Sequence, residues 1–160
     1  MSRVGKDSVV SSTNAVNVFL GRYDYALDPK KRFTIPSGWR RAMGDPADVF
    51  VMPDPTEQCL NLIPPDLMRS RVEEMEKKAL LDPSLNRLLR LIGQNSEQLT
   101  LDCQGRIRVC DKLLQFANLT TTVAMVGSVR LIKLWNPELL GPEESVNLDE
   151  FREAVKELGF

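Results

Sequence analysis

The 160-residue sequence contains no histidine and only three cysteines. Without an imidazole, the chain has no histidine general base, no serine–histidine or cysteine–histidine nucleophile pair, and no histidine ligand for a catalytic zinc ion. Cys59, Cys103 and Cys110 form an odd number without a Cys-x-x-Cys pair, which argues against a disulfide framework and a four-thiolate zinc site. The sequence also lacks a glycine-rich phosphate loop. These absences predict a protein that is not an enzyme and binds neither a metal nor a cofactor.

Long apolar runs are missing as well. No stretch of about 20 apolar residues is present, which excludes an ordinary transmembrane helix and predicts no membrane partner. Residues 1–17 contain no apolar segment of the kind a secretory signal needs, and we interpret them as a flexible N-terminal extension. These features predict a cytoplasmic protein.

The charge is nearly balanced but unevenly distributed. The sequence has 21 Lys and Arg against 22 Asp and Glu, a net charge of −1. Residues 1–45 carry eight basic and four acidic side chains, so the amino-terminal third is locally basic, whereas the remainder is acidic. A local basic patch can attract a polyanion even when the total charge is close to zero. The acidic segment 143–157 is expected either to be exposed or to pack against a neighbouring subunit.

An internal repeat organises the chain. Residues 27–36 read LDPKKRFTIP and residues 101–110 read LDCQGRIRVC, at an offset of 74. Similar segments follow in the same order. We therefore predict five regions: an extension (1–17), a first repeat (18–64), a helical crossover (65–94), a second repeat (95–138) and a C-terminal helical tail (139–160).

Within each copy the hydrophobic residues alternate with polar ones, which is typical of half-buried strands. We expect a β-hairpin around each Asp-x-x-x-Arg turn, then a short segment and a second strand pair. Residues 66–92 show helical spacing, with Asp82-Pro83 as an N-cap and first position and Gly93 as the end, and a further helix is expected from Asp149. A copy of about 45 residues cannot bury its apolar face alone, so the two should pack as one pseudo-symmetric unit.

The first repeated turn suggests two roles for its charges. Asp28 and Arg32 stand at opposite ends of a tight turn and can face each other. They can be a structural ion pair, which stabilises little when exposed. Alternatively, the carboxylate holds the guanidinium so that it can bond guanine O6 and N7 in the major groove of DNA, which a two-stranded β-ribbon also fits. The two roles are compatible.

Other basic residues surround the first turn. Lys30 and Lys31 project from it and are either ordinary solvated lysines or phosphate contacts. Arg22 is expected to flank them, whereas Arg40 and Arg41 are equally well explained as surface residues.

The second turn has less positive charge. Asp102 and Arg106 remain, but Cys103-Gln104-Gly105 replaces the lysines, and Gly105 supplies the positive φ of a tight turn. We therefore expect the first repeat to dominate DNA contact and Arg106 to be structural, with a DNA contact as the alternative.

These motifs resemble the MraZ family of bacterial transcriptional regulators, which are built from two SpoVT-AbrB-like repeats. The resemblance rests on the two Asp-x-x-x-Arg turns, and further matches are FLGRY (19–23), FTIP (33–36), residues 85–93 with Arg87 and Arg90, Val126-Gly127 and Leu134-Trp135. Lys31 departs from the family, which usually has glycine there, and Cys110 stands where a proline or small residue is frequent.

The resemblance implies a mainly β fold with α-helices: a β-barrel of the swapped-hairpin AbrB type formed by two pseudo-symmetric repeats, plus crossover helices. It also implies ring-like homo-oligomers in the cytoplasm and nucleoid. These would bind double-stranded DNA at tandem promoter repeats of the division and cell-wall gene cluster, including the protein's own promoter. The expected DNA-binding residues are Arg32, Lys30, Lys31, Arg22 and Arg106, and the turn-organising residues are Asp28, Asp102 and Gly105. The alternative is an AbrB-fold protein-interaction module, similar to an antitoxin, that does not bind DNA.

Overall fold

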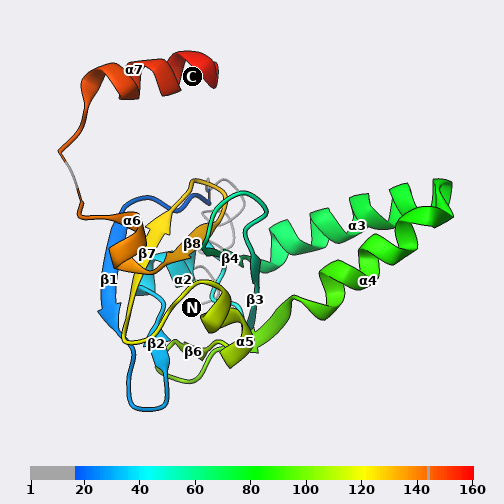
Figure 1. Ribbon diagram of the computed structural model, residues 1–160, viewed down its shortest axis with the longest axis horizontal. Coiled ribbons are helices and arrows are strands. Elements are labelled where there is room, and N and C mark those ends of the chain that lie inside the picture. Colours follow the sequence, from blue (N-terminus) through cyan, green and yellow to red (C-terminus); the bar gives the residue numbers. More distant parts are fainter. Residues whose placement is uncertain (1–16, 144) are drawn as a thin grey trace, which may run out of the picture.

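A computed structural model describes residues 17–143 and 145–160, so the extension predicted over residues 1–17 lies outside the described part except for its last residue. The chain forms antiparallel strands and several helices (Figure 1), in agreement with the predicted class of mainly β with α. In chain order the elements are β1 (Arg22–Ala26), β2 (Arg32–Thr34), α2 (Ser37–Ala42), β3 (Asp48–Pro53), β4 (Leu60–Ile63), α3 (Pro65–Leu81), the 3₁₀ turn η1 (Pro83–Leu85), α4 (Asn86–Gln94), β5 (Glu97–Thr100), β6 (Arg106–Arg108), α5 (Asp111–Phe116), β7 (Thr122–Gly127), β8 (Ile132–Trp135), α6 (Pro137–Leu140) and α7 (Leu148–Glu157).

The strands form a six-stranded sheet and a separate two-stranded ribbon. The order in the sheet is β1-β7-β8-β4-β3-β5, and the ribbon pairs β2 with β6. All pairs are antiparallel, and β1 and β5 are the two edges of the sheet. The succession strand–strand–helix–strand–strand occurs twice, over residues 22–63 and 97–135.

The predicted hairpins around the two Asp-x-x-x-Arg turns are wrong, whereas the predicted pairs β3–β4 and β7–β8 are confirmed. β1 pairs with β7 rather than β2, and β5 pairs with β3 rather than β6. Each turn closes tightly but then directs the chain from the sheet into the ribbon. Alternation of apolar residues specifies which face of a strand is buried, but it does not specify the neighbouring strand, and this is why the sequence pattern misled here.

The core is built from both halves of the chain. Phe33 and Ile107 of the ribbon and Val51, Leu62 and Leu134 of the sheet are almost fully buried and belong to one cluster. The alternation in the ribbon is therefore confirmed, because its apolar residues point inward.

The edge strand β1 buries less than its pattern suggests. Tyr23 and Tyr25 remain partly exposed, and the ring of Tyr23 packs edge-on against buried Trp39, with 4.9 Å between the ring centres. The Trp39 Nε1–H donates a hydrogen bond to the Leu20 carbonyl oxygen (3.2 Å). α2 is fixed to the start of the sheet by these contacts.

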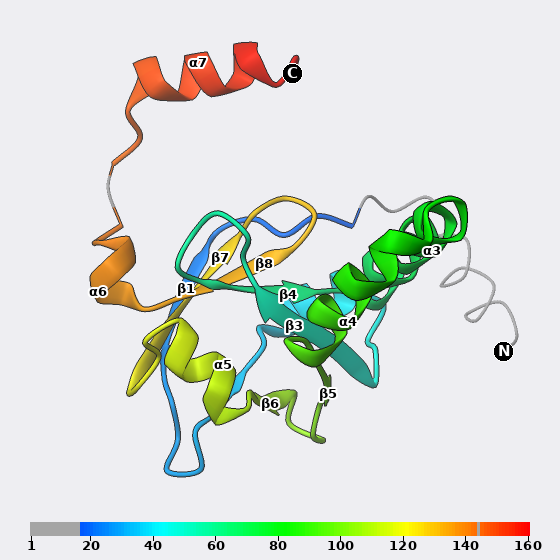
Figure 2. The same cartoon turned by 45° about the vertical axis from the view of Figure 1, so that its right-hand side comes forward.

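The predicted helices at 66–92 form an arm. α3 and α4 run side by side away from the sheet (Figures 1 and 2), and we call residues 65–94 the arm. Asp82 caps η1 between them, and its carboxylate accepts hydrogen bonds from the Ser84 amide (3.1 Å) and hydroxyl (2.6 Å), as the Asp-Pro signal predicts. The second helix continues through Gly93 and ends at Gln94, one residue past the predicted end.

The last helix stands apart from the sheet. α7 begins at Leu148, one residue before the predicted start, because the Asn147 side chain accepts hydrogen bonds from the Asp149 and Glu150 amides. Figures 1 and 2 both show it clear of the strands, beyond α6. Among the residues that the structure describes, no helix has the length and apolar character needed to cross a bilayer.

Candidate nucleic-acid interface

The first Asp-x-x-x-Arg turn is closed by one carboxylate. Asp28 Oδ1 accepts hydrogen bonds from the amides of Lys30 (2.9 Å) and Arg32 (2.7 Å), and Oδ2 accepts from Arg32 Nε (2.7 Å). The Asp28 amide donates to the Arg32 carbonyl oxygen (2.9 Å). The backbone and side-chain hydrogen bonds from Arg32 hold the pKa of Asp28 below its usual value of 3.8, against a smaller opposing effect of desolvation. The carboxylate therefore stays ionised and holds the guanidinium.

The second turn has the same geometry. Asp102 Oδ1 accepts from the amides of Gln104 (2.9 Å) and Arg106 (2.9 Å), and Oδ2 accepts from Arg106 Nε (2.7 Å). Hydrogen bonds from Arg106 likewise lower the pKa of Asp102. The Arg32 and Arg106 side chains are 29% and 28% exposed, so the two arginines are alike in exposure as well as in their aspartate contacts. These contacts do not distinguish a DNA-reading Arg32 from a structural Arg106, so that distinction stays a prediction.

Both turns place their fourth residue in the left-handed region, with φ of 61° at Lys31 and 77° at Gly105. A non-glycine residue there is strained by about 1–2 kcal/mol. At Gly105 a close approach adds to this requirement, because a Cβ atom would lie 2.5 Å from Cζ of Arg40. The Arg40 guanidinium covers the second turn and donates from Nε to the Ile35 carbonyl oxygen (3.0 Å). Arg40 therefore has a specific position at this site.

The ribbon brings the two arginines to one surface. β2 and β6 pair Arg32 with Arg108, Phe33 with Ile107, and Thr34 with Arg106. Because the central pair is buried, the flanking residues point to the opposite, outer face. Three arginines thus line the outside of a two-stranded antiparallel ribbon. Both turns lie at the lower end of the molecule in Figures 1 and 2, where the loop between β1 and β2 is the lowest point.

The charged groups around the ribbon are partly neutralised. Asp111 Oδ1 accepts from Lys31 Nζ (3.2 Å) and from an Arg108 Nη (3.0 Å). Hydrogen bonds from Arg108 and Lys31 lower the pKa of Asp111. Lys30 is exposed and forms no ion pair with any residue in the described ranges. We call Lys30, Lys31, Arg32, Arg106 and Arg108 the ribbon cations.

Arg108 is a residue that the sequence reasoning did not select. The signal was available in the alternation Arg106-Ile107-Arg108, which puts both arginines on the same face of a strand once Ile107 is buried. Its position opposite Arg32, however, depends on the pairing of β2 with β6, which local pattern does not reveal.

Arg22, which was expected to flank the first turn, has another environment. Its Nε donates to Asp24 Oδ1 (2.8 Å), and one Nη donates to the Gly141 carbonyl oxygen (2.9 Å), so its side chain is mostly covered. Arg22 opens β1, whereas the turn lies beyond the other end of that strand (Figure 1). The structure therefore does not bring Arg22 together with the ribbon cations.

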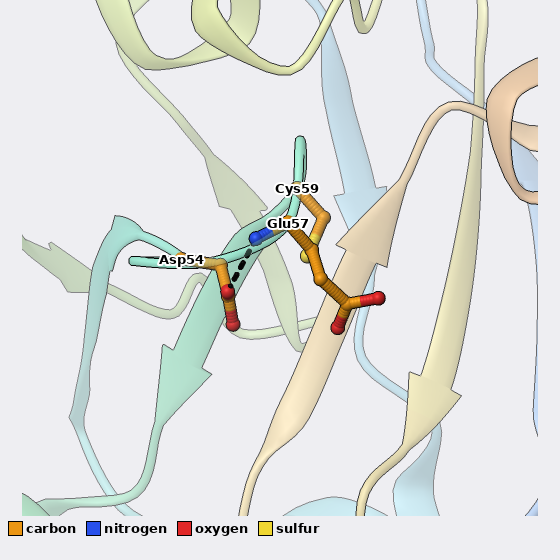
Figure 3. Close-up of side chains that lie close together, drawn as sticks. All are labelled: Asp54, Glu57 and Cys59. Carbon is orange, nitrogen blue, oxygen red and sulfur yellow. Dashed lines mark hydrogen bonds between the residues drawn. The ribbon is translucent and has the colours of Figure 1, made fainter.

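A second polar cluster lies at the turn between β3 and β4. Figure 3 shows the side chains of Asp54, Glu57 and Cys59 close together; their ligand atoms lie within 4.8 Å of one another. Lys133 Nζ already stands between the two carboxylates, 2.6 Å from Asp54 Oδ2 and 3.1 Å from Glu57 Oε1. Burial raises the pKa of the Cys59 thiol to about 11, which disfavours the thiolate that metals bind.

Lys133 neutralises the carboxylates of this cluster. Burial opposes the ionisation of Asp54, but hydrogen bonds from Lys133 and from the amides of Thr56 and Glu57 outweigh it and hold the pKa of Asp54 well below its usual range. The Lys133 ammonium group occupies the place between the carboxylates that a metal cation would take. We therefore interpret the cluster as structural: its ion pairs hold the β3–β4 turn against β8.

Several known proteins are similar to this sequence over most of its length. No family model matches the chain. The sequence is 30% identical over 146 residues to a protein of Dictyoglomus turgidum, covering 88% of this chain and 98% of the relative. It is 28% identical over 144 residues to one of Clostridium acetobutylicum (89% and 99% covered), and 31% identical over 121 residues to one of Herpetosiphon aurantiacus (76% and 82% covered). Each of these relatives is named transcriptional regulator MraZ.

Proposed function

Because the chain belongs to the MraZ family of transcriptional regulators, we propose that it is a sequence-specific regulator that binds double-stranded DNA through its β2–β6 ribbon and two Asp-x-x-x-Arg turns. One observation carries the proposal: two arginines, each held by an aspartate at 2.7 Å, lie on the outer face of the same ribbon. We assign the chain no catalytic role.

The held arginines suit base recognition. Within each guanidinium group the aspartate binds only Nε, and within the described part of the chain the Nη groups of Arg32 and Arg106 make no hydrogen bond. These groups are therefore available to bond guanine O6 and N7, and a pre-oriented guanidinium loses less conformational entropy on binding. A two-stranded antiparallel ribbon also has the dimensions that the major groove admits. We therefore assign Arg32 and Arg106 to base contacts.

The remaining ribbon cations suit the DNA backbone. Lys30, Lys31 and Arg108 surround the two held arginines and are exposed. Each phosphate that they neutralise contributes about 0.9 to the dependence of affinity on salt. Arg22 receives a structural role in this proposal, since its partners are Asp24 and Gly141.

A single ribbon offers few contacts, so the proposal includes assembly. We propose that several copies form a ring-like homo-oligomer in the cytoplasm and nucleoid. Identical ribbons on one rim would bind tandem promoter boxes of the division and cell-wall gene cluster, including the protein's own promoter, with an avidity that one copy lacks. We propose that the fold is of the swapped-hairpin AbrB type that the resemblance implies, and the pairing of β1 with β7 and of β5 with β3 across the two halves of the chain supports this.

The test is a DNA-shift assay on the tandem boxes upstream of the gene, with full-length variants. Arg32→Ala and Arg106→Ala should each weaken specific binding by about 5- to 150-fold, since a bidentate base contact is worth about 1–3 kcal/mol. Arg87→Ala is the matched control, because Arg87 is exposed on the arm, away from the ribbon. Undiminished binding by both ribbon variants defeats the mechanism. A stoichiometric protein partner with no DNA retention would favour the antitoxin-like interaction module instead.

A further inference from the structure

The carboxylate of Asp111 engages two of the ribbon cations at once. Its Oδ1 accepts hydrogen bonds from Lys31 Nζ (3.2 Å) and from an Arg108 Nη group (3.0 Å). Among the residues that the structure describes, the carboxylate has no other hydrogen-bond partner. Lys31 belongs to the turn that precedes β2, and Arg108 ends β6. One acidic side chain at the start of α5 therefore holds cations from two separate segments of the chain.

This contact differs from the aspartate–arginine contacts of the two turns. In each turn the carboxylate binds only Nε within the guanidinium group and leaves the Nη groups free. Asp111 instead engages the ammonium group of Lys31 and an Nη group of Arg108, and the other Nη group of Arg108 donates to the Val109 carbonyl oxygen. These are the groups with which lysine and arginine contact phosphate. Asp111 therefore occupies donors that the proposed DNA contact needs.

The Asp111 cluster exists at one end of the ribbon only. β6 and α5 begin 74 residues after β2 and α2, so each member of the cluster has a counterpart at the other end. The counterparts of Lys31, Arg108 and Asp111 are, in that order, Gly105, Thr34 and Ser37. None of these three carries a charge. The carboxylate is thus present at the end that has the two additional cations and missing at the end that lacks them.

The Asp111 side chain has room to move away. It is 58% exposed, and it lines a hollow of about 350 Å³ together with Gln115, Asn118 and Thr120. Ion pairs between exposed side chains are weak, because solvent screens the charges and both side chains lose conformational freedom. A phosphate group of DNA can therefore displace the carboxylate, which then has free space on the side of the hollow.

We infer that Asp111 competes with DNA phosphate for the ribbon: in the free protein its carboxylate holds Lys31 and Arg108, and phosphate displaces it when DNA binds. This inference rests on the proposed function and adds a residue that lowers the affinity for duplex DNA. Because phosphates are the same in every sequence, Asp111 weakens binding to the boxes and to any other duplex by the same factor. It therefore sets the strength of binding, whereas the held arginines set the sequence preference.

Asp111→Asn tests the competition, because it removes the charge and keeps the shape of the side chain. In DNA-shift assays with the full chain at about 0.1 M salt, this variant should bind the tandem boxes about 2- to 30-fold more tightly than the wild type, the range that corresponds to two exposed ion pairs. A duplex of unrelated sequence should show the same gain. Damage to the fold cannot produce tighter binding, so the direction of the change is informative by itself.

Asp66→Asn is the matched control. Asp66 also lies in the first turn of a helix and pairs with an arginine three positions away, Arg69 (3.0 Å), but it belongs to the arm. Both variants change the net charge by the same amount. Asp66→Asn should leave the affinity for either duplex within about two-fold of the wild type, since charges beyond the Debye length of about 10 Å are screened. An equal gain in both variants overturns the inference, because net charge would then explain it.

A double-mutant cycle identifies the donors that Asp111 holds. Lys31→Gln should weaken binding about 1.5- to 5-fold more in the Asp111→Asn background than in the wild type, because only in the wild type must the lysine first leave its partner. Arg108→Gln should show the same dependence. The inference is overturned if both substitutions cost the same in the two backgrounds. It is also overturned if Asp111→Asn weakens binding, since Asp111 would then orient the cations for DNA.

Arg32→Ala in the same assays separates this inference from the proposed function. If the wild type prefers the boxes, Arg32→Ala loses that preference and Asp111→Asn binds as the wild type does, the competition is overturned and the proposed function stands. If Asp111→Asn binds both duplexes more tightly while the wild type shows no preference for the boxes, sequence-specific binding is overturned and the competition stands. A wild type that binds neither duplex overturns both.

Discussion

The two Asp-x-x-x-Arg turns share one frame but present different surfaces. The aspartate of each accepts two amide hydrogen bonds and one from arginine Nε. Between these fixed ends the first turn carries Lys30 and Lys31, and the second carries Cys103 and Gln104 followed by Gly105. The aspartate and arginine at the ends of the motif therefore set its geometry, whereas the residues between them are free to vary in charge.

The fourth position is where the turns differ most in their packing. Gly105 is buried under Arg40, whereas Lys31 extends outward to Asp111. A side chain is therefore accepted at the left-handed position of the first turn and excluded from that of the second. Gly105 is therefore required for two reasons: its positive φ, and the close approach of the Arg40 side chain.

The largest effect should come from giving the second turn the residue of the first. Gly105→Lys should lower the free energy of unfolding by about 2–3 kcal/mol, since it adds the cost of a left-handed side chain and displaces Arg40 from the Ile35 carbonyl oxygen. Urea denaturation measures the change. If the free energy of unfolding fell no more than for an exposed surface substitution, Arg40 would move aside without cost. The two turns would then accept a side chain at the fourth position equally well.

Charge in the middle of the turns should control salt dependence. Lys30→Ala/Lys31→Ala should reduce the slope of log affinity against log salt by about 1.8, since each lysine is assigned one phosphate. Cys103→Lys/Gln104→Lys should raise the slope by a similar amount, because it transfers the charge to the other turn. Titrations at several salt concentrations measure both. An unchanged slope in the first variant would remove the lysines from the interface.

The reverse exchange in the first turn should have a small effect of opposite sign. Lys31→Gly should raise the free energy of unfolding by about 0.5–1 kcal/mol, because glycine adopts a φ of 61° without strain. The variant also loses the exposed ion pair between Lys31 and Asp111, which lowers the free energy of unfolding only slightly. Thermal and urea unfolding of the variant test the sign, and destabilisation would contradict the strain assigned to Lys31.

The smallest effect concerns pH, because both aspartates are screened by solvent. Their folded-state pKa values lie below 3.8, so each stabilises the fold above about pH 4, and this share is lost as the pH falls through the lowered value. Asp28→Asn and Asp102→Asn should each reduce the difference in unfolding free energy between pH 6 and pH 3. We expect equal reductions, and unequal ones would break the equivalence of the two turns.

Much of the fold was readable from local pattern. The Asp82-Pro83 cap, the helices near 66–92 and from Asp149, and the β3–β4 and β7–β8 pairs involve neighbours in sequence, where spacing and capping chemistry act directly. The hairpins failed because the first and second strands of each half find their partners far along the chain, β1 with β7 and β2 with β6.

The candidate site divides in the same way. The Asp28–Arg32 and Asp102–Arg106 contacts were predictable, since four residues of a tight turn bring both ends together. Arg108 and the cover of Gly105 by Arg40 were not, because each depends on elements from different halves of the chain. The partners of Arg22 were not predictable for the same reason: Gly141, one of the two, is 119 residues away.

The strand faces, the helix caps and the closed geometry of both turns follow from local sequence, because they depend on residues a few positions apart. Which strands pair, and that three arginines meet on one ribbon, is settled by the assembled fold. Those outcomes depend on which distant apolar faces bury one another, and the free energy of that burial is a property of the whole core.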